Sequence, residues 1–171
     1  MFSLNSLRKK FTNSLYFNQW SLMIDISDDL STNFSIFKKI IPPKDRFWAD
    51  PFIVYKNEKY YVFFEEFVYS EKIGHISLIK IDKNGNYSKP EKILDLPFHL
   101  SYPFIFEFQK NYYFIHASIS KNRASVDLFK CTDFPYKWEF YKELIPNVPL
   151  VDTTLFYYKD KWWLFACVAN N

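Results

Sequence analysis

The sequence predicts an all-β protein and, within that class, a β-propeller of about three blades whose ring is incomplete. The first observation is the composition: 22% of the residues are aromatic, with 20 Phe and 13 Tyr, whereas only 2 of 171 are Gly. Aromatic and β-branched side chains fit a pleated, half-buried surface, so this composition favours strands. The second observation is an internal repeat of about 50 residues, a period typical of propeller blades.

Three segments carry the repeat, and they align over 18 positions without a gap at offsets of 52 and then 50 residues. They are 50–67 (DPFIVYKNEKYYVFFEEF), 102–119 (YPFIFEFQKNYYFIHASI) and 152–169 (DTTLFYYKDKWWLFACVA). Each reads as an apolar run, a polar turn and a second apolar run, which predicts two strands joined by a tight turn. The apolar residues alternate or run together instead of recurring every three to four positions, so amphipathic helices are excluded.

Shorter segments between the copies repeat as well and supply further strands. Residues 75–82 (HISLIKID) match 125–132 (SVDLFKCT) at an offset of 50, and each is followed by another strand candidate, at 90–96 and 138–144. The segments 20–26 and 34–41 form a similar pair ahead of the first copy. Four strands in each unit are typical of a propeller blade.

These repeats predict the domain organisation. We expect an N-terminal extension over 1–17 and a propeller over 18–171, with repeat units at about 20–67, 75–119 and 125–169. Three partial blades cannot close a ring, and an open ring leaves strand edges unpaired. We therefore expect the sequence to be a fragment of a longer protein, or to close by association with another chain.

Charge, hydropathy and cysteine usage limit the binding partners and the cellular location that the sequence allows. A formal net charge of +3 with scattered lysines does not indicate a nucleic-acid-binding surface. No stretch reaches the roughly 18 apolar residues that a membrane span needs, and no apolar core of signal-peptide length flanks Arg8. Cys131 and Cys167 lie in apolar runs without metal-binding spacing, so two reduced, buried thiols are expected. These features predict a soluble, cytoplasmic protein without a membrane span.

Four motifs resemble a known family: RFWADPF (46–52), FFEEF (63–67), HLSYPF (99–104) and VDTTLF (151–156). They are similar to the N-terminal domain of the glucosamine inositolphosphorylceramide transferase type and its bacterial relatives, which often accompany polysaccharide or glycolipid synthesis. The resemblance covers about residues 18–170. More remotely, the chain resembles the propellers of glycoside hydrolase families 43 and 32, which implies a β-propeller of the five-bladed glycosyl hydrolase type.

The resemblance to the hydrolases implies roles for two aspartates, the candidate catalytic residues. Asp50, which precedes Pro51, occupies the position of the base or nucleophile, and Asp152 that of a residue that orients the substrate. The general acid of those families is a Glu of the fourth blade, which this sequence lacks. Ala117 stands where relatives of the transferase type tend to carry a Glu. Because glycoside cleavage needs two carboxyl groups with separate roles, we expect the 171-residue chain alone to be inactive.

The candidate substrate-binding residues come from a strand and a loop. Glu65 and Glu66 are neighbours in a strand, so they point to opposite faces and only one can line a pocket. His99, Ser101 and Tyr102 lie in the loop that enters the second copy, and loops at the ends of elements often carry binding residues. Tyr102 also aligns with the two candidate catalytic aspartates.

The tryptophans divide into two groups. Trp48 lies outside the repeated strands and is the expected ligand-stacking residue at the mouth of the pocket, beside His99. Trp162 and Trp163 take the aromatic-pair positions of the repeat, which predicts that they belong to the core. His99 has no second His or carboxylate at metal-binding spacing, so neither a metal nor a cofactor is expected.

These features lead to three functional hypotheses. The first is a carbohydrate-related propeller domain that binds a sugar or glycoconjugate within polysaccharide or glycolipid biosynthesis. The second is the N-terminal part of an active glycosidase or glycosyltransferase-associated enzyme, with further blades or a C-terminal domain in the full-length protein. The third is a protein-binding propeller scaffold, because fold alone does not define function.

Overall fold

The computed structural model describes residues 19–27, 31–120 and 123–169, and the predicted extension over 1–17 lies outside this range. Apart from a 3-10 turn, η1 (Phe34–Ile36), the regular elements of the described residues are β-strands. No helix in this part of the chain has the length and apolar character needed to span a bilayer. The all-β prediction is confirmed.

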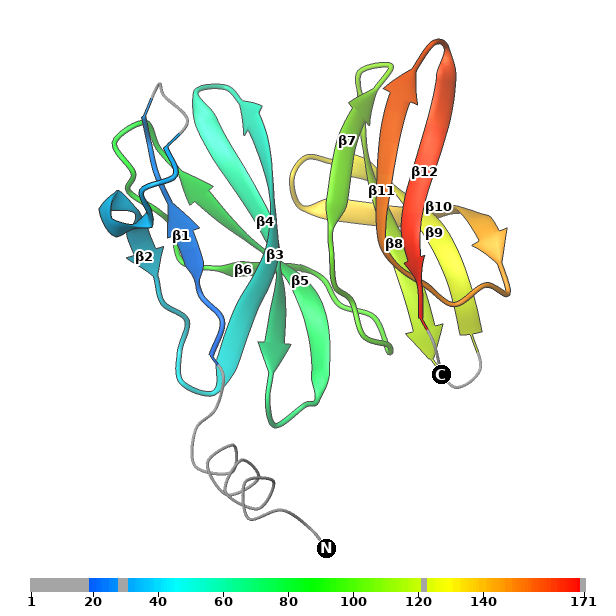
Figure 1. The fold of residues 1–171 in the computed structure, drawn as a ribbon, viewed down its shortest axis with the longest axis horizontal. Coiled ribbons are helices and arrows are strands. Elements are labelled where there is room, and N and C mark those ends of the chain that lie inside the picture. Colours follow the sequence, from blue (N-terminus) through cyan, green and yellow to red (C-terminus); the bar gives the residue numbers. More distant parts are fainter. Residues whose placement is uncertain (1–18, 28–30, 121–122, 170–171) are drawn as a thin grey trace, which may run out of the picture.

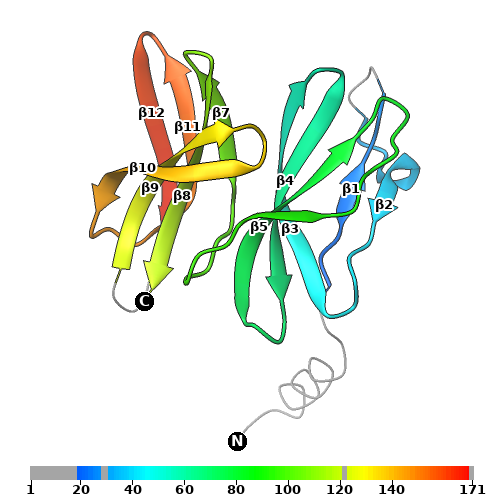
Figure 2. The same cartoon turned by 180° about the vertical axis from the view of Figure 1, so that it is seen from behind.

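The described strands form four antiparallel sheets (Figures 1 and 2). An N-terminal pair joins β1 (Leu22–Ile24) to β2 (Lys38–Ile40). The first blade has the order β3 (Arg46–Lys56), β4 (Lys59–Val68), β5 (Ile73–Ile81), β6 (Glu91–Leu94). The second blade has the order β7 (Phe104–Phe108), β8 (Asn111–Ser120), β9 (Arg123–Asp133), β10 (Lys137–Pro146). A C-terminal pair joins β11 (Leu150–Tyr158) to β12 (Lys161–Val168).

Each aligned copy of the repeat forms the inner hairpin of one unit: β3–β4, β7–β8 and β11–β12. Each hairpin turn consists of two residues with positive φ, namely Asn57 and Glu58, Gln109 and Lys110, Lys159 and Asp160. Such turns match the twist of the flanking strands. None of the six residues is Gly, so each turn accepts a left-handed conformation that costs roughly 1–2 kcal/mol per residue, which strand pairing and packing must offset.

A second left-handed residue recurs where each copy begins: Asp50 (φ 50°), Tyr102 (φ 48°) and Asp152 (φ 55°). In β3 the pairing register shifts between Ala49 and Phe52, and β11 shifts at the equivalent place. A bulge of this kind bends the strand and re-aims a side chain. The repeat therefore specifies a special backbone position at the same end of each inner strand, in addition to a strand pattern.

The hydrophobic core lies in layers between stacked sheets. The layer between the two blades is built on Phe63, Ile76, Leu78, Phe114, Phe129 and Trp138. The other face of the first blade packs on the N-terminal pair through Leu22, Ile40, Trp48, Phe64 and Ile79. The second blade packs on the C-terminal pair through Ile115, Val126, Leu128, Leu150, Leu155 and Leu164. Each blade is thus covered on both faces, as successive propeller blades are.

Two predictions about burial are wrong for the C-terminal pair. Trp162 and Trp163 are 41% and 49% exposed, and Cys167 is exposed while Cys131 is half-buried. Trp162 packs against Phe106 with ring centroids 5.2 Å apart, but the opposite face of the pair lies open. The sequence pattern predicts which side chains share a face, and burial then depends on whether another sheet covers that face.

Candidate functional site

The three left-handed residues of the repeat meet at one end of the inner strands. The backbone N–H of Tyr102 donates to Oδ2 of Asp50 over 3.3 Å. The phenol oxygen of Tyr102 lies 2.8 Å from the hydroxyl oxygen of Thr154, which follows the Asp152 bulge on β11. The Asp152 carboxyl lies close enough to raise the pKa of both Asp50 and Glu65. One polar cluster therefore collects side chains from all three copies.

Glu65 completes this cluster from β4. Its residue is 6% exposed, and it pairs across the hairpin with Ala49, the residue before Asp50. Burial, followed by the nearby Asp50 and Asp152 charges, raises the pKa of Glu65 to about 8. Burial also raises the pKa of Asp50, although the Tyr102 amide opposes this. Burial therefore disfavours the ionised form of both carboxyl groups.

His99 lies beside Glu65 in the loop between β6 and β7. The Gly74 N–H donates to Nδ1 of His99 over 2.9 Å, which places the proton of a neutral imidazole on Nε2. Nε2 lies 3.5 Å from Oε1 of Glu65. Burial lowers the pKa of His99 despite the opposing charge of Asp50, which favours the neutral ring. The side chain is 43% exposed, so it forms an edge of the cluster that a ligand can reach.

Gly74 is required by this arrangement. A Cβ at position 74 would lie 2.7 Å from the Leu100 carbonyl oxygen, 2.8 Å from Cε1 of His99 and 3.0 Å from Oε1 of Glu65. Contacts below about 3 Å are severe overpacking for rigid neighbours. The absence of a side chain at Gly74 therefore lets the loop that carries His99 approach β5 and Glu65.

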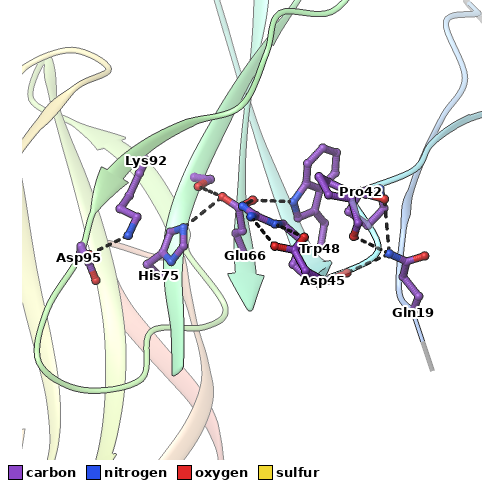
Figure 3. Close-up of polar contacts among 11 residues, drawn as sticks. Gln19, Pro42, Asp45, Trp48, Glu66, His75, Lys92 and Asp95 are labelled. Atoms are coloured by element: carbon purple, nitrogen blue, oxygen red, sulfur yellow. Dashed lines mark hydrogen bonds and ion pairs between the residues drawn. The ribbon is translucent and has the colours of Figure 1, made fainter. Parts of the chain in front are cut away.

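Glu66 belongs to a separate polar network on the opposite face of β4 (Figure 3). Its carboxylate accepts hydrogen bonds from Nη1 of Arg46 at 2.9 Å, Nε1 of Trp48 at 3.1 Å, Nε2 of His75 at 3.1 Å and Oγ of Ser77 at 2.6 Å. Burial alone would raise the pKa of Glu66, but these four donors together lower it below its ordinary value. Glu66 is therefore an ionised structural group that ties β3, β4 and β5 together.

The structure sorts the predicted site residues into two groups. It brings Asp50, Glu65, His99, Tyr102 and Asp152 together. Glu66 takes part in the separate network described above.

Trp48 lies apart from that cluster, whereas Ser101 directly precedes Tyr102. Trp48 is 4% exposed and packs on Phe64 with ring centroids 5.0 Å apart, on the Glu66 side of the first blade. The predicted position of Trp48 at the mouth of the pocket is therefore wrong, because the N-terminal pair covers it. The carbonyl of Ser101 lies 3.3 Å from Nδ1 of His116 inside the second blade, and a role for Ser101 in binding stays a prediction.

Sequence reasoning missed Gly74 and Thr154. Gly74 carries a signal, since it is one of only two glycines in the chain and directly precedes a strand residue of the repeat. Thr154 lies in the VDTTLF motif, but its hydroxyl reaches Tyr102 only because β11 packs beside the second blade.

Among the described residues, no group of three or more His, Cys, Asp or Glu side chains has the geometry to hold a metal ion. A groove of about 480 Å³ lies away from the carboxyl cluster, between the second blade and the C-terminal pair, lined by residues such as Phe106, Tyr113 and Trp162. Its walls are mostly apolar, Gln109 and Lys142 being exceptions, and no carboxyl group lines it. The groove is large enough for a ligand, but the polar groups that could bind a sugar lie in the Asp50–Glu65 cluster, which is therefore the candidate functional site.

Comparison with known proteins identifies the family. Residues 21–171 match the family described as "Glucosamine inositolphosphorylceramide transferase 1, N-terminal". The chain belongs to this family. It is 34% identical over 121 residues to the Glucosamine inositolphosphorylceramide transferase 1 of Oryza sativa subsp. indica, and 31% identical over 121 residues to that of Arabidopsis thaliana. These matches cover 70% of this chain but only 16% and 15% of the two plant proteins.

The fold has a counterpart among solved structures. The GH32 beta-fructofuranosidase BmSUC1 of Bombyx mori superposes with a TM-score of 0.62 at 17% sequence identity, covering 75% of this chain and 31% of the enzyme. This match confirms the predicted propeller class with an incomplete set of blades. The predicted resemblance to the transferase family and to the hydrolase propellers is likewise confirmed. The expected total of five blades is a property of a full ring and stays a prediction.

Proposed function

We propose that this chain is a carbohydrate-related propeller domain that binds a sugar or glycoconjugate at the Asp50–Glu65 cluster. The observation that carries the proposal is the convergence of three repeat-equivalent residues, Asp50, Tyr102 and Asp152, each held in a left-handed conformation. Strain in the backbone that recurs at one point of three strands is typical of a functional site.

The chemistry of the cluster suits sugar hydroxyls. Carboxylate oxygens of Asp50 and Asp152 accept hydrogen bonds from hydroxyl groups. The Tyr102 phenol can both donate and accept, and the exposed edge of His99 adds a ring nitrogen. A small set of placed polar groups in a cluster of this kind fixes the orientation of a ligand.

Family membership supports glycolipid or polysaccharide biosynthesis as the context. The curated relatives are named for a transferase, glucosamine and inositolphosphorylceramide. We extend this to the present chain as a proposal: its ligand is a glycoconjugate headgroup or a sugar used to build one. The chain spans about one sixth of the length of these relatives. We therefore propose that transfer chemistry belongs to a larger protein, which has further blades or a C-terminal domain. We also propose that this protein is cytoplasmic.

The second hypothesis, an active glycosidase or a glycosyltransferase-associated enzyme, is favoured by one observation. Asp50 and Glu65 are two carboxyl groups whose pKa values burial raises, to about 8 for Glu65, and carboxyl groups with shifted pKa values serve as acids and bases in hydrolases. Against it, Ala117 stands where relatives of the transferase type tend to carry a Glu. Binding is therefore the function that the geometry supports best, ahead of a protein-binding scaffold.

The experiment is a binding assay on the purified chain. Calorimetry and ligand-observed NMR would use methyl glucoside, N-acetylglucosamine, glucosamine and myo-inositol, with a chromogenic glycoside assay alongside. We expect saturable binding of at least one probe without turnover. Absence of binding by every probe would refute the proposal, and turnover at an enzymatic rate would favour the enzyme hypothesis instead.

A further inference from the structure

We propose that two copies of this chain complete each other's half-blades. The N-terminal pair, β1–β2, and the C-terminal pair, β11–β12, are two-stranded sheets, whereas each blade has four strands. In the proposed dimer, β1 of one copy pairs with β12 of the other, so that the two pairs together form one four-stranded blade. This inference concerns association between copies and does not rest on the proposed function.

The two pairs correspond to different halves of a blade. β11–β12 is the third copy of the inner hairpin, equivalent to β3–β4 and β7–β8. β1–β2 matches the outer half instead: Leu22 follows a serine, as Leu78 of β5 does, and both leucines are buried against the next blade along the chain. An inner half and an outer half together make one whole blade.

Each half-blade has an open edge at the place where the other half would pair. In the complete blades the second strand pairs with the third, as β4 does with β5 and β8 with β9. β12 takes the second position and β1 the third, yet within residues 19–27, 31–120 and 123–169 neither strand has that neighbour. Unpaired strand edges are templates for pairing with another chain.

Two hollows in the surface lie where the missing halves belong. The groove of about 480 Å³ lies beside β12, between Leu164 and residues of the second blade such as Leu128. A second hollow of about 320 Å³ lies beside β1, between Ile24 and residues of the first blade such as Tyr60. The stack of sheets places the two pairs on opposite flanks of the blades (Figure 1). Because neither pair lies beside the hollow next to the other, a second copy must supply the missing half.

The exposed side chains of both pairs fit this arrangement. Met23 of β1 is 38% exposed and lies on the face opposite to Leu22; pairing with β12 would carry it into the groove beside Leu164. Phe165 of β12 is 57% exposed, and pairing would carry it over Tyr60 of the second copy. Exposed apolar surface of this kind marks an interaction site.

The repeat specifies the register of the proposed pairing. In the first blade, Phe63 of the second strand pairs with Leu78 of the third. The equivalent positions pair in the second blade as well. In the half-blades these positions are Phe165 and Leu22, so we expect these two residues to lie opposite each other across the interface.

Two copies are enough to close a ring. Each copy holds two complete blades and both halves of a third, so two copies joined at both half-blades give a ring of six blades, within the four to eight of known propellers. Head-to-tail contacts form closed rings when the rotation between copies closes. A ring of six from two copies is the alternative to the five blades expected of one longer chain.

Disulfide trapping tests the register. Continued along the antiparallel strands, the register places Cys167 of one copy opposite Trp20 of the other, and both residues are exposed. With oxidised glutathione we expect Trp20→Cys to give about ten-fold more disulfide-linked dimer than Ile36→Cys, because cysteines more than about 7 Å apart are not bridged. Ile36 is the matched control, since it is 56% exposed and follows the far end of β1. Trp20→Cys combined with Cys167→Ser should give no linked dimer, which excludes Cys131 as the bonding partner.

Sedimentation velocity tests the association without a new thiol. We expect the wild type to sediment as a dimer, Met23→Lys as a monomer because an unpaired charge would be buried in the groove, and the control Ile36→Lys as a dimer. Circular dichroism verifies that Met23→Lys keeps its strands. Equal cross-linking of Trp20→Cys and Ile36→Cys overturns the proposal. A monomeric wild type overturns it too, and leaves further blades of a longer protein as the occupants of both open edges.

Discussion

The backbone N–H of Tyr102 donates to the Asp50 carboxyl over 3.3 Å, although the two residues lie 52 positions apart. They occupy the same position in successive copies of the repeat, and both are left-handed. The repeat thus brings equivalent strand ends within hydrogen-bond distance. A carboxyl group held by the next blade's backbone is oriented without the use of a second side chain, which leaves side chains available for a ligand.

The first prediction concerns the two aspartates. Asp50→Asn and Asp152→Asn should each weaken sugar binding roughly five- to a hundred-fold, because one well-placed hydrogen-bond partner contributes on the order of 1–3 kcal/mol. Asn is preferable to Ala because both sites have positive φ, which Asn tolerates. Calorimetry measures the effect. Glu58→Gln, in the exposed turn of the first hairpin, is the control and should bind normally; equal affinity in all variants would refute the site.

The second prediction concerns Gly74. Gly74→Ala should destabilise the fold by about 1–3 kcal/mol, since overpacking in a tight region costs that much, and it should displace His99 from Glu65. Urea unfolding measures the stability, and a ¹³C NMR titration of the Glu65 carboxyl reports the displacement. Gly85→Asn is the control, because Gly85 is left-handed and far from the cluster in the turn after β5. A titration curve for Gly74→Ala identical to wild type would contradict the positioning role.

The third prediction concerns the Glu66 network. Its pKa is lowered by four donors despite burial, so the ionised form is the stabilising one. The stabilisation is present above the ordinary value of 4.5 and is lost as the pH falls below it. Glu66→Gln should therefore cost about 1–3 kcal/mol at pH 7 and lessen the loss of stability in acid. Urea unfolding at pH 7 and pH 4 would show this, and an unchanged midpoint at pH 7 would count against the network.

The fourth prediction has the opposite sign and concerns Glu65. Its pKa rises from 4.5 to about 8 on folding, so the folded state binds the extra proton between these values. Stability from this group is complete below about 4.5, falls as the pH rises towards 8, and changes no further above that. The midpoint of thermal unfolding should fall between pH 5 and pH 9 in the wild type. We expect a smaller fall in Glu65→Gln and an unchanged fall in Glu66→Gln. A wild-type profile as flat as that of Glu65→Gln would disprove the burial of a neutral acid.

The fifth prediction concerns the open face of the C-terminal pair. Phe156, Trp163 and Phe165 are 55%, 49% and 57% exposed there. Ile115 occupies the position of Phe165 in the second copy of the repeat, and it is fully buried because the C-terminal pair covers it. Such a face invites association, so the isolated chain should form oligomers that Phe165→Lys dissociates. Sedimentation velocity measures this, and Ile41→Lys is the control for adding a lysine. A wild-type chain that stays monomeric at high concentration would contradict it.

The sequence by itself determined the strands, the hairpins and the equivalence of Asp50, Tyr102 and Asp152. These features follow from period-two alternation, from polar turn residues and from an ungapped repeat, all of which are local properties of the chain. It also determined that Glu65 and Glu66 lie on opposite faces, because adjacent strand residues alternate.

Only the tertiary structure decided which glutamate joins the site and which aromatic residues are buried. Trp48 is covered because the N-terminal pair packs on its face, whereas Trp163 is open because its sheet is covered on one side. The Gly74–His99–Glu65 arrangement likewise depends on a loop that returns against β5. The burial of a carboxyl group, and with it the pKa, depends on neighbours that folding brings from distant parts of the sequence. A local sequence pattern does not specify these neighbours.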